Sequence, residues 1–233
     1  MAQRDLPDAA ALSRVPLFTG IDERALRPVL QAAQSVTRPA SERFFQQGDA
    51  ASFFYVLTHG RVKMTQVTPE GHQVVLRLIG PGDAFGGVAA FGDPIYPATA
   101  EAIEQATALS WDGQTMHRLL ESDPRLAVNA LRVVASRLHD LQNRYRELTT
   151  ERVERRVART ILRLARESGR KVDAGVQIDF PISREDLAEM TGTTIYTVSR
   201  LVSAWEERGL VESGRQRIVI RNPHGLVRIA EDL

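Results

Sequence analysis

Short apolar stretches separated by turn residues run through much of the N-terminal half of the chain. Five of them are rich in β-branched, aromatic or aliphatic residues, as strands are: residues 53–57, 62–67, 74–79, 98–103 and 106–111. Gly60 and the segments 68–71 and 80–83 supply the positive or fixed φ angles that hairpins require. Many short strands joined in this way predict a small β-roll or jelly roll. The preceding residues, 16–33, have the spacing of short helical segments.

A different pattern begins near residues 123–124, where a proline suits the first turn of a helix. Apolar side chains then alternate at spacings of four and three residues through Ala127, Leu131, Val134, Leu138, Leu141, Tyr145 and Leu148. Charged residues flank this heptad stripe, which is typical of a two-stranded coiled coil. The alternative is that the stripe packs on the chain's own β-roll. We expect a long helix through which two copies of the chain form a homodimer.

Residues 183–209 predict two short helices joined by a tight turn. Ser183 and Asp186 can cap the first helix reciprocally, and Gly192 lies where the chain must turn with an unusual φ angle. The second helix has the spacing of an inward face at Ile195, Val198, Val202 and Trp205. Its outer face is left with Thr194, Tyr196, Thr197, Ser199 and Arg200.

That outer face has the chemistry of a DNA-reading helix. An arginine can bind a guanine edge through two hydrogen bonds, while serine and threonine can bond to bases or phosphates. An ordinary helical hairpin inside a core is the alternative, but a buried surface would not place Ser199 and Arg200 in this register. We therefore predict that the second helix binds in the major groove of double-stranded DNA.

The segments on either side complete a winged helix-turn-helix. Residues 151–168 predict an amphipathic helix, and residues 176–182 with the pair of strands around 213–215 predict a small sheet with a hairpin. We expect Arg184, Arg215 and Arg217 to contact phosphates. For the wing, an ordinary solvated surface is the alternative.

Composition limits the class of protein. A chain of 233 residues with 43% hydrophobic content can form two domains with separate cores. No apolar run approaches the roughly 18 residues that cross a bilayer, and the charged N-terminal stretch is unlike a secretory signal. We expect a cytoplasmic protein with no membrane partner. The absence of cysteine excludes disulfides and thiolate-bound iron-sulfur clusters.

The charge balance gives DNA binding little general support. The net charge is +1, and the residues after 150 hold 15 Lys and Arg against 13 Asp and Glu. Binding must therefore depend on where a few arginines and helix N-termini are placed, because the overall field is weak.

From about residue 16 to residue 223 the chain resembles the Crp/Fnr superfamily of bacterial transcription regulators. The spacing of Ala188, Gly192 and Val198 is similar to the family's helix-turn-helix pattern, and TVSR at residues 197–200 is similar to the part of its recognition helix that meets DNA. The resemblance implies a β-roll sensor, RNA polymerase as a partner, and a guanine read by Arg200. Two-fold symmetry then implies an inverted-repeat site with half-sites about 34 Å apart.

The chain departs from the family at the start of the recognition helix. Ile195 and Tyr196 stand where many members carry Arg or Val followed by Glu. A phenol does not accept a hydrogen bond from cytosine as a carboxylate does, so the family's usual half-site is not implied here.

The resemblance also implies an effector site between the β-roll and the long helix. In nucleotide-binding members F-G-E-L is followed about ten residues later by R-S/T-A, where the Glu holds the ribose and the Arg holds the cyclic phosphate. The matching positions here are Phe85, Gly86, Gly87 and Val88, and then Ala98 and Thr99 after Pro97. Each missing hydrogen bond to a charged group lowers the binding free energy of the nucleotide by about 1.5–3 kcal/mol. We therefore expect no high-affinity binding of cyclic AMP. One possibility is a dimer that is active without any effector, its sensor pocket filled by its own side chains.

Haem is the other candidate effector group, because some members of the family sense carbon monoxide or nitric oxide through one. We expect His59, His72 and His224 to be solvated in turns or near the C-terminus, which leaves His117 and His139 as possible ligands. A lone histidine is more often a surface or core residue than a ligand. We predict no cofactor and no metal site, with haem as the alternative.

Taken together, these patterns predict an α+β fold in three parts. Residues 1–120 form a cyclic-nucleotide-binding-like β-roll sensor, residues 121–149 the long dimerisation helix, and residues 150–233 a winged helix-turn-helix domain. No H-E-x-x-H, Walker A or G-x-S-x-G motif is present, so we predict that the protein is not an enzyme. The predicted function is a homodimeric, sequence-specific, DNA-binding transcription regulator that does not depend on cyclic AMP. The alternative is a small-molecule or haem-based gas sensor whose C-terminal domain mainly contacts protein.

Overall fold

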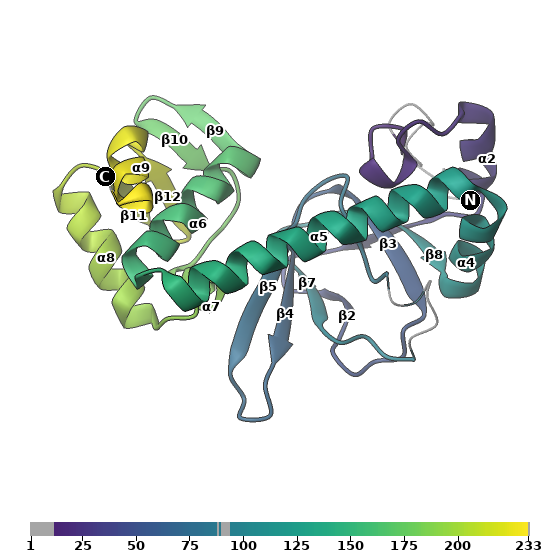
Figure 1. Cartoon of the computed structure of the whole chain (residues 1–233), viewed down its shortest axis with the longest axis horizontal. Helices are drawn as coiled ribbons and strands as arrows, with labels where there is room; N and C mark the ends of the chain where they lie inside the picture. Colours follow the sequence, from purple (N-terminus) through teal and green to yellow (C-terminus); the bar gives the residue numbers. More distant parts are fainter. Residues whose placement is uncertain (1–11, 88, 90–93, 233) are drawn as a thin grey trace. The chain divides into compact units, whose positions relative to one another are not determined.

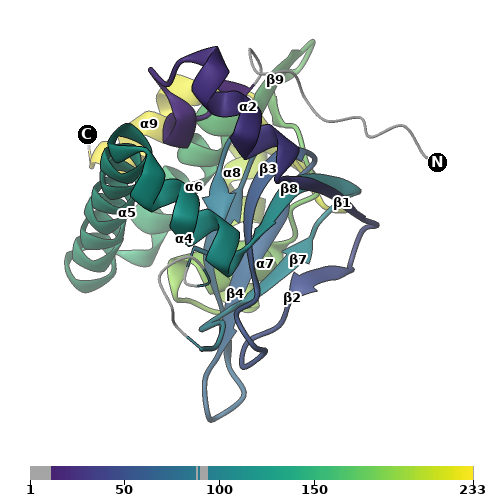
Figure 2. The ribbon, with the colours of Figure 1, turned by 90° about the vertical axis from the view of Figure 1, so that its right-hand side faces the viewer.

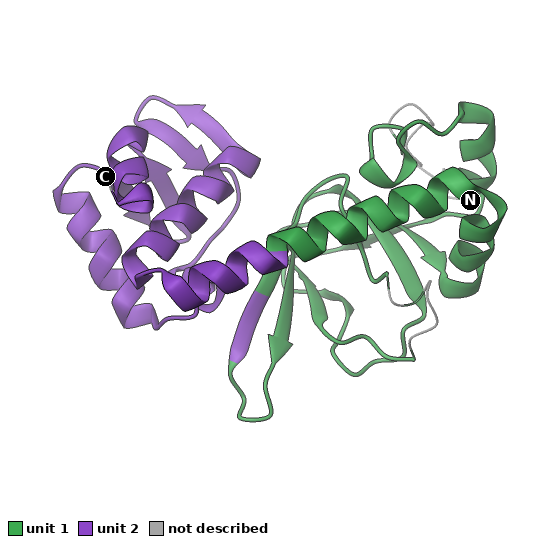
Figure 3. Ribbon diagram, in the orientation of Figure 1, with its two compact units in different colours: residues 1–72, 76–140 green, residues 73–75, 141–233 purple. Residues whose placement is uncertain are grey.

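The computed structural model describes residues 12–87, 89 and 94–232. The chain divides into two compact units, coloured separately in Figure 3. Unit 1 comprises residues 1–72 and 76–140, and unit 2 comprises residues 73–75 and 141–233.

Two four-stranded sheets form the predicted β-roll. One sheet has the order β1 (Gln34–Arg38), β8 (Ala106–Asp112), β3 (Phe53–His59) and β6 (Ala84–Phe85). The other has the order β2 (Arg43–Phe45), β7 (Thr99–Ala102), β4 (Val62–Val67) and β5 (Gln73–Ile79). Buried residues from both sheets, among them Leu57, Val62 and Ile79, pack into one apolar core. The five predicted strands are confirmed as β3, β4, β5, β7 and β8, whereas β1, β2 and β6 were not predicted.

The turn between β3 and β4 shows why a glycine is needed there. Gly60 has φ 76°, in the left-handed region. A Cβ atom at this position would lie 2.2 Å from the carbonyl oxygen of Gln105, so any other residue would also collide with the neighbouring turn.

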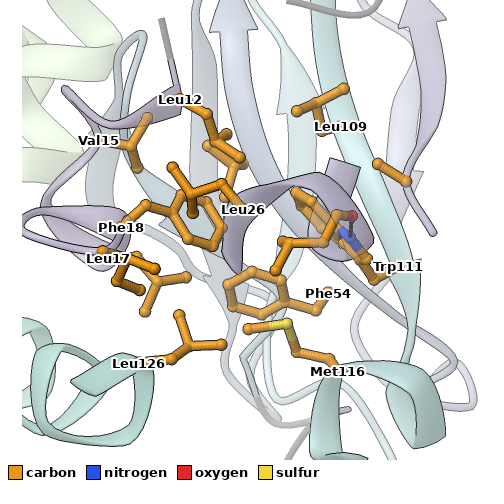
Figure 4. Close-up of a cluster of buried hydrophobic side chains, with 14 residues drawn as sticks. Leu12, Val15, Leu17, Phe18, Leu26, Phe54, Leu109, Trp111, Met116 and Leu126 are labelled. Carbon is orange, nitrogen blue, oxygen red and sulfur yellow. Dashed lines mark hydrogen bonds between the residues drawn. The ribbon is translucent and has the colours of Figure 1, made fainter. Parts of the chain in front are cut away.

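Helices gather at one end of the roll around a second apolar core (Figures 1, 2 and 4). They are the 3-10 helix η1 (Pro16–Phe18), α2 (Glu23–Gln31), α4 (Gly113–Ser122) and the start of α5 (Pro124–Thr150). Leu26, Trp111, Met116 and Leu126 are among the side chains of this core in Figure 4. Trp111 Nε1 also donates a hydrogen bond to the Val29 carbonyl (2.8 Å), which joins α2 to strand β8. The helical segments predicted within residues 16–33 and the long helix from residue 124 are therefore confirmed.

Unit 2 is a winged helix-turn-helix. It contains α6 (Val153–Ser168), α7 (Arg184–Thr191), α8 (Ile195–Glu207) and α9 (Pro223–Glu231). Its sheet has the order β11 (Val211–Gly214), β12 (Arg217–Ile220), β10 (Gly175–Ile178) and β9 (Gly169–Val172). Strand β9 and helix α9 were not predicted. Among the described residues, no helix combines the length and apolar character needed to span a bilayer.

Candidate nucleic-acid interface

Sequence-local caps fix the start of α7 and both ends of the turn that joins α7 to α8. The Asp186 N–H donates to Ser183 Oγ (2.9 Å) and the Ser183 N–H donates to Asp186 Oδ2 (2.9 Å), which is the predicted capping box. Helix α7 ends at Gly192, whose φ angle is 61°. Helix α8 begins after Thr194, whose Oγ1 accepts a hydrogen bond from the Thr197 N–H (3.2 Å). Both ends of the turn are therefore fixed by sequence-local bonds.

The inner side of α8 packs into unit 2. Val198, Val202 and Trp205 are buried, and Trp205 Nε1 donates to Glu154 Oε1 of α6 (3.2 Å). The prediction that Ile195 faces inward with them is wrong, because 43% of this residue is exposed. Ile195 is the first residue of α8, and its Cβ points toward the helix N-terminus, beyond the edge of the covered face.

The outer side of α8 carries the polar residues that were predicted for it. Thr194, Tyr196 and Arg200 are exposed, and Thr197 and Ser199 lie half-buried on its flanks. Tyr196 is 84% exposed. Arg200 has no ion-pair partner among the described residues. Residues near the start of a recognition helix are those that reach base edges, so this side of α8 has the composition and position of a groove-reading surface.

Arg184 lies against the wing. Its Nη2 donates to Ser213 Oγ (2.9 Å) and is 3.8 Å from Glu206 Oε2, while Glu206 Oε1 accepts a hydrogen bond from the Ser213 N–H (2.6 Å). These bonds join the first residue of α7, the last turn of α8 and strand β11. Phosphate contact by Arg184 stays a prediction, and its guanidinium already has two partners within the domain.

The two predicted wing arginines differ in their surroundings. Arg215 is exposed in the turn between β11 and β12, next to Gln216 with φ 55°, and has no ion-pair partner in the described part of the chain. Arg217 Nη2 donates to Glu212 Oε1 (2.7 Å), and Glu212 Oε2 is also 3.6 Å from Arg221. The charge of Arg217 is thus compensated on the wing itself, whereas the charge of Arg215 is not.

Arg156 of α6 supports the helix-turn-helix and was missed by the sequence analysis. Its guanidinium donates to the carbonyls of Thr191 (3.0 Å) and Gly192 (3.4 Å) at the end of α7, and to the carbonyl of Glu151 (2.8 Å). The cation occupies the negative end of the helix dipole and satisfies carbonyls that the helix leaves free. The available signal was its spacing, three residues after Val153 and one before Val157, which puts a charged residue on the inward face.

An apolar ridge runs along α5. It consists of exposed Leu131, Val134, Leu138, Leu141, Tyr145 and Leu148, which were all predicted, and Tyr145 is 70% exposed. Ala127 is half-buried at the edge of this ridge, and Val128 beside it is exposed. The alternative in which this stripe packs on the chain's own β-roll is contradicted, because the ridge residues of unit 1 are exposed there. A ridge of large apolar side chains at heptad spacing is the surface that a coiled coil buries.

The opposite side of α5 is bonded to unit 1. The buried Asn129 donates through Nδ2 to the carbonyls of Leu17 (3.1 Å) and Thr19 (2.8 Å). Further along, Arg137 Nη2 forms an ion pair with Asp83, which is also 3.1 Å from Arg77 Nη2. The side of α5 that turns away from the ridge is therefore fixed at two points.

The predicted effector residues lie within or beside the core of the roll. Phe85 and Ala98 are buried, and the Thr99 hydroxyl accepts a hydrogen bond from the Gln47 N–H (3.0 Å). Gly86 has φ 68°, and a Cβ there would lie 2.8 Å from the Phe53 carbonyl oxygen. Gly87 is half-buried, and Val88 lies outside the described residues.

Aromatic rings occupy the core next to Gly86. The rings of Phe45 and Tyr96 stack with centroids 3.8 Å apart, and those of Tyr55 and Phe85 stack at 4.9 Å. The Tyr96 hydroxyl donates to the Phe53 carbonyl (2.7 Å) and accepts from the Phe53 N–H (2.8 Å). Burial raises the pKa of Tyr55 to about 12 and also raises the pKa of Tyr96, so both phenols are neutral at ordinary pH.

The histidines lie on different elements of the fold. His59 is the last residue of β3, not part of a turn as predicted, and His117 Nε2 is 3.4 Å from Glu121 Oε1 on the exposed side of α4. His139 is exposed on α5. Within the described residues, no three His, Asp or Glu side chains are grouped so that they could hold a metal ion.

Comparison with known proteins agrees with this architecture in both units. Residues 36–123 match the family described as "Cyclic nucleotide-binding domain", and residues 155–229 match the "Crp-like helix-turn-helix domain". The Cyclic AMP receptor protein of Thermus thermophilus is 29% identical over 92% of this chain and 96% of its own length. The CRP-like cAMP-activated global transcriptional regulator of Mycobacterium tuberculosis is 26% identical over 94% of this chain and 98% of its own.

Solved structures give the same result. A CRP-family transcriptional regulator from Thermus thermophilus has a TM-score of 0.74 and 25% identity, covering 84% of this chain and 96% of its own. The relatives and structural neighbours are transcription regulators with a helix-turn-helix. The chain accordingly belongs to the Crp/Fnr superfamily and is a transcription regulator of that type, with a helix-turn-helix DNA-binding domain.

Proposed function

We propose that this regulator binds an inverted-repeat DNA site as a homodimer, with α8 of each copy in a major groove. The observation that carries the proposal is the outer side of α8, where Tyr196 and Arg200 are exposed on a helix that is capped and backed by buried residues. An arginine without an internal partner has its donors available for a guanine edge. Because α8 is fixed within unit 2, little reordering is needed when it binds.

The ridge on α5 supports the two-fold arrangement. Exposed leucines at heptad spacing lose contact with water when a second copy of the helix packs on them. A parallel pair of α5 helices presents two copies of α8 to the same face of a duplex, and half-sites one turn apart, about 34 Å, match that symmetry. RNA polymerase is the partner that a regulator of this superfamily is expected to engage.

Selection of bound sequences from a random DNA pool, followed by Arg200→Ala, tests the assignment. The substitution should cost about 1–3 kcal/mol on the selected site and relax the preference at one base pair. Arg208→Ala, which removes the same charge at the other end of α8, should leave that preference unchanged. If Arg200→Ala retains both affinity and preference, α8 has been assigned wrongly. If no sequence is selected, a sensor whose C-terminal domain contacts protein becomes the better account.

We also propose that DNA binding does not require cyclic AMP, although two relatives are named for that nucleotide. Gly87 and the buried Ala98 provide no charged group for a ribose or a phosphate, and the Thr99 hydroxyl is bonded to Gln47. The stacked rings beside Gly86 fill the core at this position with the chain's own side chains.

Thermal melting with and without cyclic AMP tests this second proposal. A ligand present at 100 times its Kd stabilises the folded state by about 2.7 kcal/mol, so a shift of several degrees would reveal binding. We expect no shift at micromolar cyclic AMP and no change in DNA affinity. The Thermus thermophilus Cyclic AMP receptor protein provides a matched comparison in the same assay. A clear stabilisation of the present protein would contradict the proposal.

A further inference from the structure

Two apolar side chains stand at the start of the helix that we assign to DNA. Ile195 and Tyr196 are the first two residues of α8, and they are 43% and 84% exposed. Among the described residues of α8 they are the large hydrophobic side chains that remain exposed. The side chains next to them on the outer side are polar, Ser199 and Arg200. An apolar pair at this place on a DNA-facing surface needs an apolar partner.

The major groove offers one such partner. Thymine presents a C5-methyl group there, whereas the other three bases present only hydrogen-bond donors and acceptors. Ile195 has no polar side-chain atom, and neither residue provides a carboxylate that could accept a hydrogen bond from the amino group of cytosine. We propose that Ile195 and Tyr196 select an A·T base pair in each half-site by packing against the thymine methyl group. This inference rests on the proposed binding of α8 in the major groove.

The helix places this contact close to the base read by Arg200. Ile195 and Ser199 are four residues apart, as are Tyr196 and Arg200, so the four side chains form two neighbouring columns on the outer side of α8. Four residues of helix rise about 6 Å, and one base step along a strand is about 3.4 Å. The thymine selected by the first residues of α8 therefore lies within about two base pairs of the guanine that Arg200 selects.

Deoxyuridine provides a direct test, because it differs from thymidine only by lacking the methyl group. The full-length protein would be measured by fluorescence anisotropy, at one fixed salt concentration, on its selected site and on duplexes with deoxyuridine at single positions in both half-sites. Loss of one buried methyl group should weaken binding about fourfold per half-site, or about fifteenfold for the symmetric change. Deoxyuridine elsewhere in the half-site should have little effect.

Variants of the two residues connect the effect to α8. Ile195→Ala and Tyr196→Ala should bind more weakly and lose part or all of the sensitivity to deoxyuridine, while Tyr196→Phe should keep it because the ring remains. Tyr196→Glu should replace the A·T preference with C·G, since a carboxylate accepts from cytosine. Val227→Ala, an exposed apolar residue on α9, is the matched control and should leave the sensitivity unchanged.

The outcomes separate this inference from the proposed function. A selected site without thymine within two base pairs of the Arg200 guanine, or a site that tolerates deoxyuridine there, would overturn the inference while the DNA-binding assignment stands. Failure to select any common sequence would overturn the proposed function, and the inference with it. Equal sensitivity in the wild-type protein and in both alanine variants would assign the methyl contact to other residues and overturn the inference alone.

Discussion

The core of the β-roll and the outer side of α8 contain similar groups in opposite states. In the roll, the ring of Tyr96 stacks on Phe45 and its hydroxyl has both an acceptor and a donor in the backbone of Phe53. On α8, Tyr196 is exposed and Arg200 has no ion-pair partner among the described residues. The difference is in the partners: the ring and the hydroxyl of Tyr96 have theirs within the roll, whereas Tyr196 and Arg200 of α8 are left exposed.

The ridge on α5 belongs with α8 in this comparison. Its leucines are as apolar as a core, yet they are exposed along the helix. Changes to these exposed surfaces should therefore reduce binding without unfolding the chain. Changes to the core of the roll should reduce stability without altering the DNA sequence that is bound.

The largest effect is expected from charges placed in the ridge. Leu138→Glu combined with Leu141→Glu puts two carboxylates in each helix of the dimer seam, where like charges from the two copies would face each other. We expect dissociation to monomers and a loss of about 10²–10⁴-fold in DNA affinity, because the second half-site no longer benefits from the linkage. Sedimentation equilibrium and anisotropy would measure the two effects.

Gln142→Glu, on an exposed part of the same helix outside the ridge, is the control and should preserve the dimer. Persistence of a dimer in the double variant would mean that the ridge is not the contact between copies.

A smaller effect, of the opposite kind, is expected in the roll. Phe45→Ala removes a ring that stacks on Tyr96 and contacts Tyr55, and a buried Phe→Ala substitution costs about 3–5 kcal/mol of stability. Chemical denaturation should show this loss, while the selected DNA sequence stays the same. Phe53→Ala, at a phenylalanine that is 39% exposed, should cost clearly less. An altered base preference in Phe45→Ala would weaken the separation between the two regions.

The smallest effect concerns alkaline pH. The folded-state pKa of Tyr55 is raised to about 12 by burial, from about 10 in the unfolded chain. The protonated phenol is therefore favoured by folding, so its contribution is fully present below pH 10 and is lost as the pH rises from 10 to 12. The denaturation midpoint should decrease from pH 8 to pH 11, and this decrease should be smaller in Tyr55→Phe than in the wild type. Tyr145→Phe, at an exposed tyrosine, should behave like the wild type; a Tyr55→Phe variant that does the same would contradict the assignment.

Much of this organisation was predictable because it depends on local pattern. The capping box of Ser183 and Asp186, the left-handed residue Gly192 and the heptad stripe of α5 are all set by residues a few positions apart. These signals identified the helix-turn-helix and the ridge. Short runs of β-branched, aromatic and aliphatic residues identified five strands, two of which, β3 and β8, are buried along most of their length.

The parts that were missed depend on contacts between distant segments. Arg156 was overlooked because its carbonyl partners, Thr191 and Gly192, come from a helix 35 and 36 residues away. The bond between Tyr96 and Phe53 spans 43 residues. Strands β1 and β2 are short, and β1 is mostly polar and largely exposed, so they have no clear hydrophobic pattern of their own. They are strands because they pair with β8 and β7. The exposure of Ile195 was missed because it depends on the residue at which α8 begins, and the apolar spacing alone did not show that Ile195 is the first residue of the helix.

Asn129 has a consequence for assembly. A helix that rests only on aliphatic side chains can roll or slide slightly on its support at small cost, since such contacts have no preferred direction. Two directed amide hydrogen bonds to a neighbouring segment remove that freedom. Together with the ion pair between Arg137 and Asp83, these bonds set the direction in which the unit 1 part of α5 presents Leu131, Val134 and Leu138. The proposed dimer would then meet a surface whose orientation is already defined within one chain.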